Sequence, residues 1–154
     1  MSELDHERYM RRAISLTAHV PDRPFTAVIV DRTTGEVVAE GWNKTDVNPT
    51  WHGEVDAINA LVRSGRGGGD ESVLYTTAEP CPMCMAACFW AGIGTVVFGT
   101  SIRFLTDIGW RQIDIPAEEV VRRSPGWQCV VVGGLLESEC NELFLTGSRA
   151  APGR

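Results

Sequence analysis

The sequence predicts an α/β fold in which helices cover both faces of a sheet. Short apolar runs of strand length alternate with helical segments along the 154 residues, and a strand–helix–strand succession favours right-handed parallel crossovers. Hydrophobic residues make up 44% of the chain and charged residues 22%, a balance typical of globular proteins. A chain of this length can bury a core of its own, so we expect one domain spanning residues 1–154.

Five apolar runs bounded by turn-forming residues are the expected strands: residues 25–31, 37–42, 73–77, 95–99 and 129–132. The first two flank a turn at Thr34 and Gly35, which predicts a β-hairpin. The last two contain unbroken valines, which predict strands buried on both faces. The order of the strands in the sheet does not follow from these patterns.

Five further segments are expected to be helices: residues 4–17, 52–63, 83–91, 117–123 and 137–144. The first ends before Pro21, and the second ends at the glycine-rich stretch that follows Arg63. Pro82 precedes the third, where proline is favoured because the N–H groups of a first helical turn have no partner within the helix.

The formal net charge of −6 disfavours a nucleic-acid partner, because binding a polyanion requires many Lys and Arg contacts to phosphates. A small neutral ligand fits this balance better. The first twelve residues mix acidic and basic side chains without an apolar stretch, which argues against a signal or transit peptide, and the apolar runs are too short to cross a membrane. We therefore expect a cytoplasmic protein, in which the five cysteines are thiols or metal ligands rather than disulfides.

Two short motifs carry the chemistry: His52-Gly53-Glu54 and Pro80-Cys81-Pro82-Met83-Cys84. Either motif alone is a weak signal. Together, one imidazole and two thiolates supply three ligands that zinc prefers and leave a fourth position open, as in catalytic sites. Zinc held in this way activates water, and a carboxylate close by can carry a proton to the substrate, which is the role expected of Glu54.

Both motifs fall at the expected amino termini of helices. The helix dipole and the unpaired N–H groups there favour the thiolate forms of Cys81 and Cys84. His52 and Glu54 lie on the first turn of their own helix, where both can flank an ion placed beyond the helix end. These placements predict a single zinc site shared by two helices.

The His-x-Glu motif followed by Pro-Cys-x-x-Cys resembles the signature of the cytidine deaminase superfamily. The resemblance extends to AEGWN at 39–43, NPTWHGE at 48–54, AEPCPMC at 78–84, VVFGT at 96–100 and GGLLESEC at 133–140, which are similar to the branch containing guanine deaminases and tRNA adenosine deaminases. It implies a three-layer α/β/α sandwich on a five-stranded mixed sheet. It further implies a homodimer or higher oligomer whose active sites are completed across the interface.

Carried over by position, the resemblance makes His52, Cys81 and Cys84 the zinc ligands, Glu54 the proton shuttle and Asn43 a substrate contact. Asn43 also suits a simple turn. Trp51, next to the histidine ligand, is expected to stack on a planar substrate ring.

Several positions depart from the family pattern. Thr26 and Gly53 stand where the family usually has Gly and Ala, so the floor of the pocket is expected to be narrower at Thr26. Trp51 replaces a small residue. Guanine deaminases carry an acidic residue that reads the guanine edge, but the matching position here holds Phe104, with Asp107 nearby. The substrate is therefore expected to be an aminopurine, a cytosine-like ring or a triazine, as a free base or a nucleoside, rather than guanine itself.

Three alternatives stay open. A tRNA adenosine deaminase is the first, although residues 146–154 lack the basic helix expected for gripping tRNA. The second is a binding module with structural zinc, although such a site normally has four protein ligands. The third is a redox dithiol formed by Cys81 and Cys84, which leaves His52 and Glu54 unexplained. Cys88, one helical turn after Cys84, is expected to pack in the core.

Overall fold

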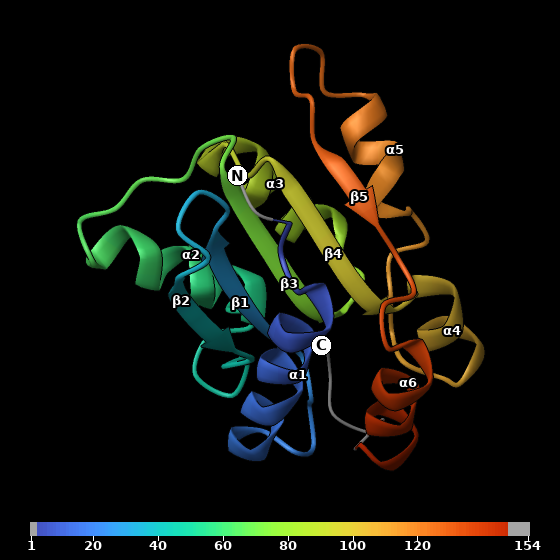
Figure 1. The fold of residues 1–154 in the computed structure, drawn as a ribbon. Coiled ribbons are helices and arrows are strands. Elements are labelled where there is room, and N and C mark those ends of the chain that lie inside the picture. Colours follow the sequence, from blue (N-terminus) through green and yellow to red (C-terminus); the bar gives the residue numbers. More distant parts are fainter. Residues whose placement is uncertain (1–2, 148–154) are drawn as a thin grey trace.

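The computed structural model describes residues 3–147, which form a five-stranded sheet with helices on both faces (Figure 1). The strand order is β2-β1-β3-β4-β5. Strand β1 pairs antiparallel with both β2 and β3, whereas β3, β4 and β5 run parallel to one another, so the sheet is mixed. The strands are β1 Thr26–Asp31, β2 Val37–Trp42, β3 Ser72–Ala78, β4 Thr95–Thr100 and β5 Val130–Val132.

Helices α1 and α6 lie on one face of the sheet, and α2, α3 and α5 lie on the other (Figure 1). Their bounds are α1 His6–Ser15, α2 Gly53–Arg63, α3 Pro82–Ala91, α4 Ile102–Asp107, α5 Ala117–Arg122 and α6 Glu137–Thr146, with a 3-10 turn at Leu16–His19 after α1. This layering confirms the expected α/β/α sandwich. Across residues 3–147, no helix is both long and apolar enough to cross a membrane.

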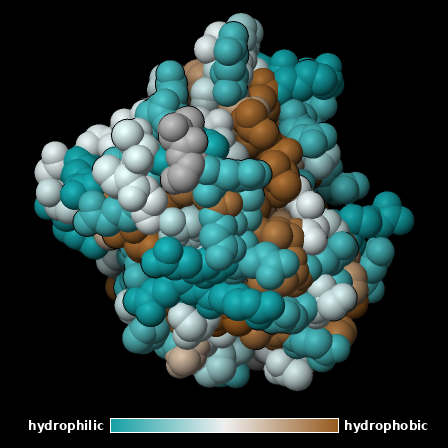
Figure 2. Space-filling view, in the orientation of Figure 1, coloured by the Kyte–Doolittle hydropathy of each residue, from teal (hydrophilic) through white to brown (hydrophobic). Residues whose placement is uncertain are grey.

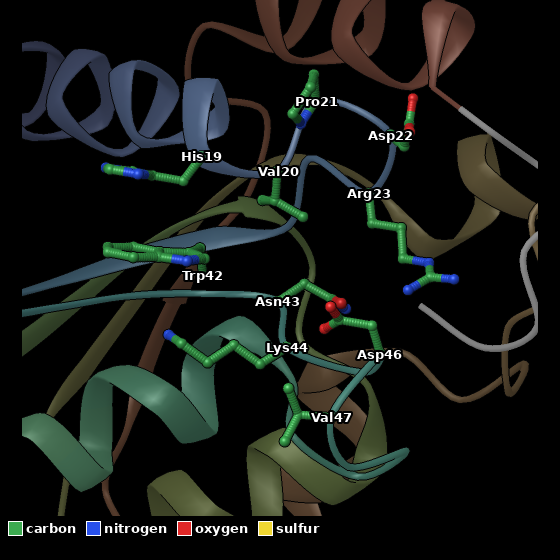
Figure 3. Close-up of a pocket in the computed structure, with 10 residues that line it drawn as sticks. All are labelled: His19, Val20, Pro21, Asp22, Arg23, Trp42, Asn43, Lys44, Asp46 and Val47. Atoms are coloured by element: carbon green, nitrogen blue, oxygen red, sulfur yellow. The ribbon is translucent and has the colours of Figure 1, made fainter.

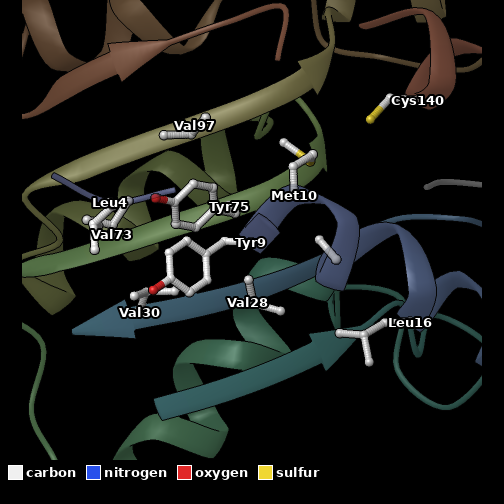
Figure 4. Close-up of a cluster of buried hydrophobic side chains, with 11 residues drawn as sticks. Leu4, Tyr9, Met10, Leu16, Val28, Val30, Val73, Tyr75, Val97 and Cys140 are labelled. Atoms are coloured by element: carbon white, nitrogen blue, oxygen red, sulfur yellow. The ribbon is translucent and has the colours of Figure 1, made fainter. Parts of the chain in front are cut away.

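The core under α1 is built from alternate residues of the central strands (Figure 4). Val28 and Val30 of β1, together with Val73 and Tyr75 of β3, point to this face and are fully buried. Tyr9 of α1 packs on Tyr75 with ring centroids 5.2 Å apart, and its hydroxyl donates a hydrogen bond to the Gly35 carbonyl. Because every second residue points this way, the intervening residues are left for the opposite face, where the functional motifs lie.

On that opposite face, α2 approaches the sheet so closely that side chains are excluded. A Cβ atom on Gly41 of β2 would lie 2.3 Å from the Ala57 backbone nitrogen, and one on Gly53 would lie 2.6 Å from the Phe25 carbonyl oxygen. Both distances are far below van der Waals contact. Direct contact between the backbone of α2 and the backbone of the sheet therefore fixes the position of the first turn of α2.

One expected feature of the sheet is wrong. The valines of β4 are buried, as predicted, but Val130 and Val132 of β5 are 57% and 45% exposed, because β5 is a three-residue edge strand. Figure 2 shows apolar side chains gathered over this strand. An unbroken valine run has the same appearance in a central strand and in an exposed edge, so composition alone does not separate them.

Candidate active site

The amino termini of α2 and α3 meet beyond the carboxyl end of β3. His52 and Cys81 occupy the N-cap positions of these helices, both with extended backbone, and neither side chain makes a hydrogen bond that caps its own helix. Pro82 holds the first turn of α3, as predicted. Both N-cap side chains are therefore directed out of their helices and towards each other.

The structure brings the three predicted ligands together. The Nδ1 atom of His52 lies 3.6 Å from the Cys81 sulfur and 3.5 Å from the Cys84 sulfur, and one ligand atom from each of the three residues lies within 4.8 Å of the other two. Bonds of about 2.1 Å to nitrogen and 2.3 Å to sulfur around a tetrahedral zinc ion put nitrogen and sulfur about 3.6 Å apart. The spacing and the donor set both fit zinc.

Glu54 lies two residues after His52 and is 1% exposed. Its Oε1 atom is 3.2 Å from the hydroxyl of Thr76 on β3, and that hydroxyl is 3.0 Å from the Ala78 carbonyl oxygen. An ionised Glu54 accepts the Thr76 hydrogen, whereas a protonated Glu54 can donate to Thr76 while Thr76 donates to Ala78. Thr76 therefore supports both protonation states of Glu54. Thr76 belongs to none of the sequence motifs. The alternation of residues along β3, which places Thr76 on the same face of the sheet as Leu74 and its neighbour Ala27, is the sequence signal that could have identified it.

The remaining cysteines stand apart from this cluster. Cys88 is fully buried in the core beneath α2 and α3, as expected from its place one turn after Cys84. Burial raises the pKa of the Cys88 thiol well above its ordinary value, which keeps it protonated. Within the described residues, the ligand cluster comprises His52, Cys81 and Cys84.

A cavity of about 220 Å³ opens beside two of the ligands. Its lining includes His52 and Cys81, Pro49 and Thr50 from the loop before α2, and three residues of the segment after α4; these are Arg111, Gln112 and Ile113. Met83 of α3 completes the lining. The cavity is smaller than the roughly 300 Å³ at the lower end of drug-sized pockets, which suits a ligand of one or two fused rings.

A single buried carboxylate fixes the segment that covers this cavity. Glu79, two residues before Cys81, accepts hydrogen bonds of 2.8 Å from the backbone N–H groups of Ile102 and Ala117, which begin α4 and α5. Trp110, between those helices, is 3% exposed and donates through its indole N–H to the Phe144 carbonyl. Glu79 thus ties the metal-ligand loop to the starts of α4 and α5, and Trp110 ties the cavity-lining segment to α6. Sequence reasoning missed both Glu79 and α4.

Asn43 lies at a second hollow of about 540 Å³, shown in Figure 3, whose described lining does not include Trp51. Asn43 lines this hollow and is 3% exposed, and its Oδ1 atom accepts hydrogen bonds from the backbone and the hydroxyl of Thr45, the turn arrangement considered above. The Trp51 indole N–H donates to Asp56 at 2.9 Å, and the Lys44 ammonium lies 5.6 Å from the Trp51 ring centre. The described lining of the metal cavity contains neither residue.

The departures at Thr26 and Gly53 have a structural explanation. The Thr26 hydroxyl donates to the Ala13 carbonyl of α1, on the face of the sheet opposite the metal cluster. Thr26 therefore does not narrow the cavity, contrary to the expectation. Gly53 faces the Phe25 carbonyl and the Thr26 Cα atom, where a Cβ atom would collide.

A three-ligand zinc site with an adjacent buried glutamate, set at two helix termini of a mixed sheet, defines a class of hydrolytic metalloenzyme. Comparison with known families agrees: residues 3–100 match the cytidine and deoxycytidylate deaminase zinc-binding region. The chain belongs to this family of zinc-dependent deaminases.

Within this family, the chain is similar to guanine deaminases and to tRNA-specific adenosine deaminases. The chain is 36% identical over 129 residues to the guanine deaminase of Bacillus subtilis, covering 75% of this chain and 81% of that protein. It is 30% identical over 144 residues to the tRNA-specific adenosine deaminase of Bacillus subtilis, covering 90% and 85%. The structure of a guanine deaminase from Nitrosomonas europaea, 22% identical, superposes with a TM-score of 0.80 over 98% of this chain and 88% of that one.

Proposed function

We propose that this protein hydrolyses the exocyclic amino group of a small nucleobase-like ring, releasing ammonia. The observation that carries the proposal is the buried Glu54 placed two residues from a ligand cluster whose spacing fits zinc. When bound, zinc supplies Lewis acidity that lowers the pKa of water for attack on the ring carbon. His52, Cys81 and Cys84 would hold it there.

Glu54 moves the proton in this scheme. Water provides the oxygen that bonds to the ring carbon, the carbon–nitrogen bond breaks, and the amino group leaves as ammonia. Glu54 takes a proton from the water and delivers it to the departing nitrogen, and Thr76 orients the carboxylate in both states. Its burial keeps bulk water from competing for the proton.

The size of the cavity supports a free base as the substrate. Its 220 Å³ accommodates a ring more readily than a polynucleotide segment. Structures that share this fold have been solved in complex with 2,6-diaminopurine and 8-azaguanine, so the fold can accept purine bases. We propose aminopurines first, followed by cytosine-like rings and triazines, with a homodimer as the working assembly.

A second candidate is deamination of adenosine in tRNA. The observation that favours it is the 30% identity to a tRNA-specific adenosine deaminase across 90% of this chain. The net charge of −6 weighs against it, because tRNA recognition needs cationic contacts to phosphates.

The test is ammonia release from a panel of aminopurines, aminopyrimidines, triazines and their nucleosides, with Glu54→Gln as the inactive variant. We expect turnover of at least one free base, a loss on the order of a hundredfold or more in Glu54→Gln, and unchanged zinc content. Glu118→Gln is the matched control, because Glu118 is an exposed first-turn glutamate of α5. An inert panel, or full activity in Glu54→Gln, rejects the proposal.

A further inference from the structure

A carboxylate on α2 accepts hydrogen bonds from both ends of the loop that joins β2 to α2. Asp56 is 4% exposed and lies one helical turn after His52, and its backbone N–H donates to the His52 carbonyl at 2.9 Å. Its Oδ1 atom accepts from the Trp51 indole N–H at 2.9 Å. Its Oδ2 atom accepts from the Trp42 backbone N–H at 3.1 Å and from the Lys44 ammonium. One side chain therefore connects both ends of the loop to the helical turn that begins at the metal ligand.

The loop between these two ends is closed by its own hydrogen bonds. The Lys44 N–H donates to the Trp51 carbonyl at 2.9 Å, and the Trp51 N–H donates to the Asn48 carbonyl at 2.8 Å. The Asn48 side chain accepts from the backbone and the hydroxyl of Thr50, both at 3.0 Å. Thr50 and its neighbour Pro49 line the metal cavity. A wall of the cavity therefore belongs to a closed loop that the carboxylate attaches to α2.

The Lys44 ammonium is held between an aromatic ring and the carboxylate. It pairs with Asp56 and lies 4.2 Å from the ring centre of Trp42, below which it extends in Figure 3. The side chains of Lys44 and Asp56 are 28% and 6% exposed, so salt screens this pair less than a pair at the surface. Removing the negative charge would leave the ammonium uncompensated.

Resting on the proposed function, we propose that Asp56 is a positioning residue that sets the place of the cavity wall at Pro49 and Thr50 relative to His52 and Glu54. Asp56 is outside the described lining of the cavity, so it acts through the loop rather than on the substrate. A displaced wall loses contact with the ring, whereas the first turn of α2 keeps the imidazole and the proton shuttle in place. Asp56 therefore governs substrate binding more than the chemical step.

All three partners of the Asp56 side chain are donors, and a carboxylate satisfies them because both of its oxygens accept. An asparagine presents one acceptor oxygen and one N–H₂ group. In Asp56→Asn, the oxygen is expected to face the two donors of Trp42 and Lys44, so the N–H₂ group meets the Trp51 indole N–H. The substitution keeps the size of the side chain and should release the Trp51 end of the loop.

The test compares Asp56→Asn with the matched control Asp31→Asn. Asp31 accepts hydrogen bonds from two backbone N–H groups in the turn between β1 and β2 and is outside the lining of the metal cavity. Both substitutions weaken hydrogen bonds to a carboxylate and should lower Tm. On the best substrate of the panel, we expect Asp56→Asn to raise KM about tenfold with kcat within about threefold and zinc content unchanged, and Asp31→Asn to leave KM unchanged. A KM within about twofold of the wild type in Asp56→Asn, or an equal rise in both variants, overturns the inference.

A double variant tests whether Asp56 acts through the loop. Trp51→Phe keeps an aromatic ring and removes the indole N–H, so in Asp56→Asn/Trp51→Phe the amide no longer meets that donor. We expect the KM of the double variant to be no higher than that of Asp56→Asn alone, a non-additive result typical of groups in direct contact. If the increases of the two single variants multiply instead, Asp56 does not act through Trp51, and the inference is overturned.

Binding in the Glu54→Gln background separates this inference from the proposed function. Calorimetry reports the affinity of each panel ring without turnover. If adding Asp56→Asn weakens the binding of rings but the wild type releases no ammonia, the proposed function fails and the inference stands. If ammonia is released and Asp56→Asn changes neither KM nor affinity, the inference fails alone. If no ring binds or reacts, both are rejected.

Discussion

The thiols of the five cysteines divide into two groups. Burial raises the pKa of Cys129 to about 11, that of Cys140 to about 12, and that of Cys88 well above the ordinary range, so these three are protonated at neutral pH. Cys81 and Cys84 instead lie at the start of α3, where the helix dipole favours thiolates. Cys81 and Cys84 are therefore the two cysteines suited to bind a metal ion.

We expect about one zinc per chain, lost in Cys81→Ala and in Cys84→Ala but retained in Cys129→Ala. Each of the first two substitutions removes one of three protein ligands, whereas Cys129 lies outside the cluster. Metal analysis of the purified variants measures the ratio. Full zinc occupancy in a Cys81 and Cys84 double variant would contradict the site.

Thr76→Val should slow turnover without removing zinc. The substitution keeps the shape of the side chain but removes the hydroxyl that bonds to Glu54. We expect kcat to fall about tenfold, in line with the loss of one hydrogen bond of about 1–1.5 kcal/mol, while KM changes little. Thr76→Ser, which keeps the hydroxyl, should restore most of the rate. Equal losses in both variants would show that packing, rather than the hydrogen bond, explains the effect.

At the scale of the elements, Glu79 links three parts of the chain that are distant in sequence. Glu79→Gln keeps one acceptor oxygen but turns an amide N–H₂ group towards a backbone N–H donor. We expect the free energy of unfolding to fall by about 2 kcal/mol and KM to rise several-fold, because the cavity-lining segment loosens. Urea denaturation and steady-state kinetics measure the two effects. Unchanged values in both would remove the proposed anchoring, with Glu118→Gln as the exposed control.

Most elements could be predicted because each has a local cause. The strands β1 and β2 and the helices α2 and α3 begin and end within a residue or two of the expected bounds. Their signals are local, because apolar periodicity, Pro82 and the glycine-rich stretch depend only on residues that are close in sequence. Helix α4 was missed because it is six residues long and is stabilised by the Ser101 cap and by Glu79, a residue 23 positions earlier. Long-range hydrogen bonds leave no local pattern.

The residues of the candidate site also differ in whether the sequence could predict them. His52, Cys81 and Cys84 could be identified from spacing, because two N-cap positions and a Cys-x-x-Cys turn carry their geometry locally. The cavity-lining residues 111–113 could not, since their segment is held by hydrogen bonds between residues distant in sequence, from Trp110 to Phe144 and from Ala117 to Glu79. Trp51 shows the converse: its place in sequence suggested a stacking role, but its indole is engaged by Asp56. The stacking role of Trp51 and the substrate contact of Asn43 stay predictions.

For the molecule as a whole, the acidic balance predicts how activity responds to salt. With a net charge of −6, the protein should show kcat/KM values for a neutral base that change less than twofold between about 50 and 200 mM salt, because no counterions are released on binding. A tRNA anticodon stem-loop should be a poor substrate. Kinetics on both substrates across the salt series measure this. Efficient deamination of the stem-loop that declines steeply with salt, with every free base inert, would favour the tRNA candidate instead.

The contact of α2 with the sheet at Gly41 and Gly53 also bears on how the chain tolerates sequence change. Ordinary core positions absorb substitutions when neighbouring side chains change rotamer. At these two glycines the neighbours are main-chain atoms, which have no rotamers to change. Sequence drift can therefore remodel the walls of the cavity, and with them substrate choice, while the imidazole of His52 keeps its place. The separation of a rigid reaction centre from adaptable walls is what allows one scaffold to acquire new substrates without rebuilding its chemistry.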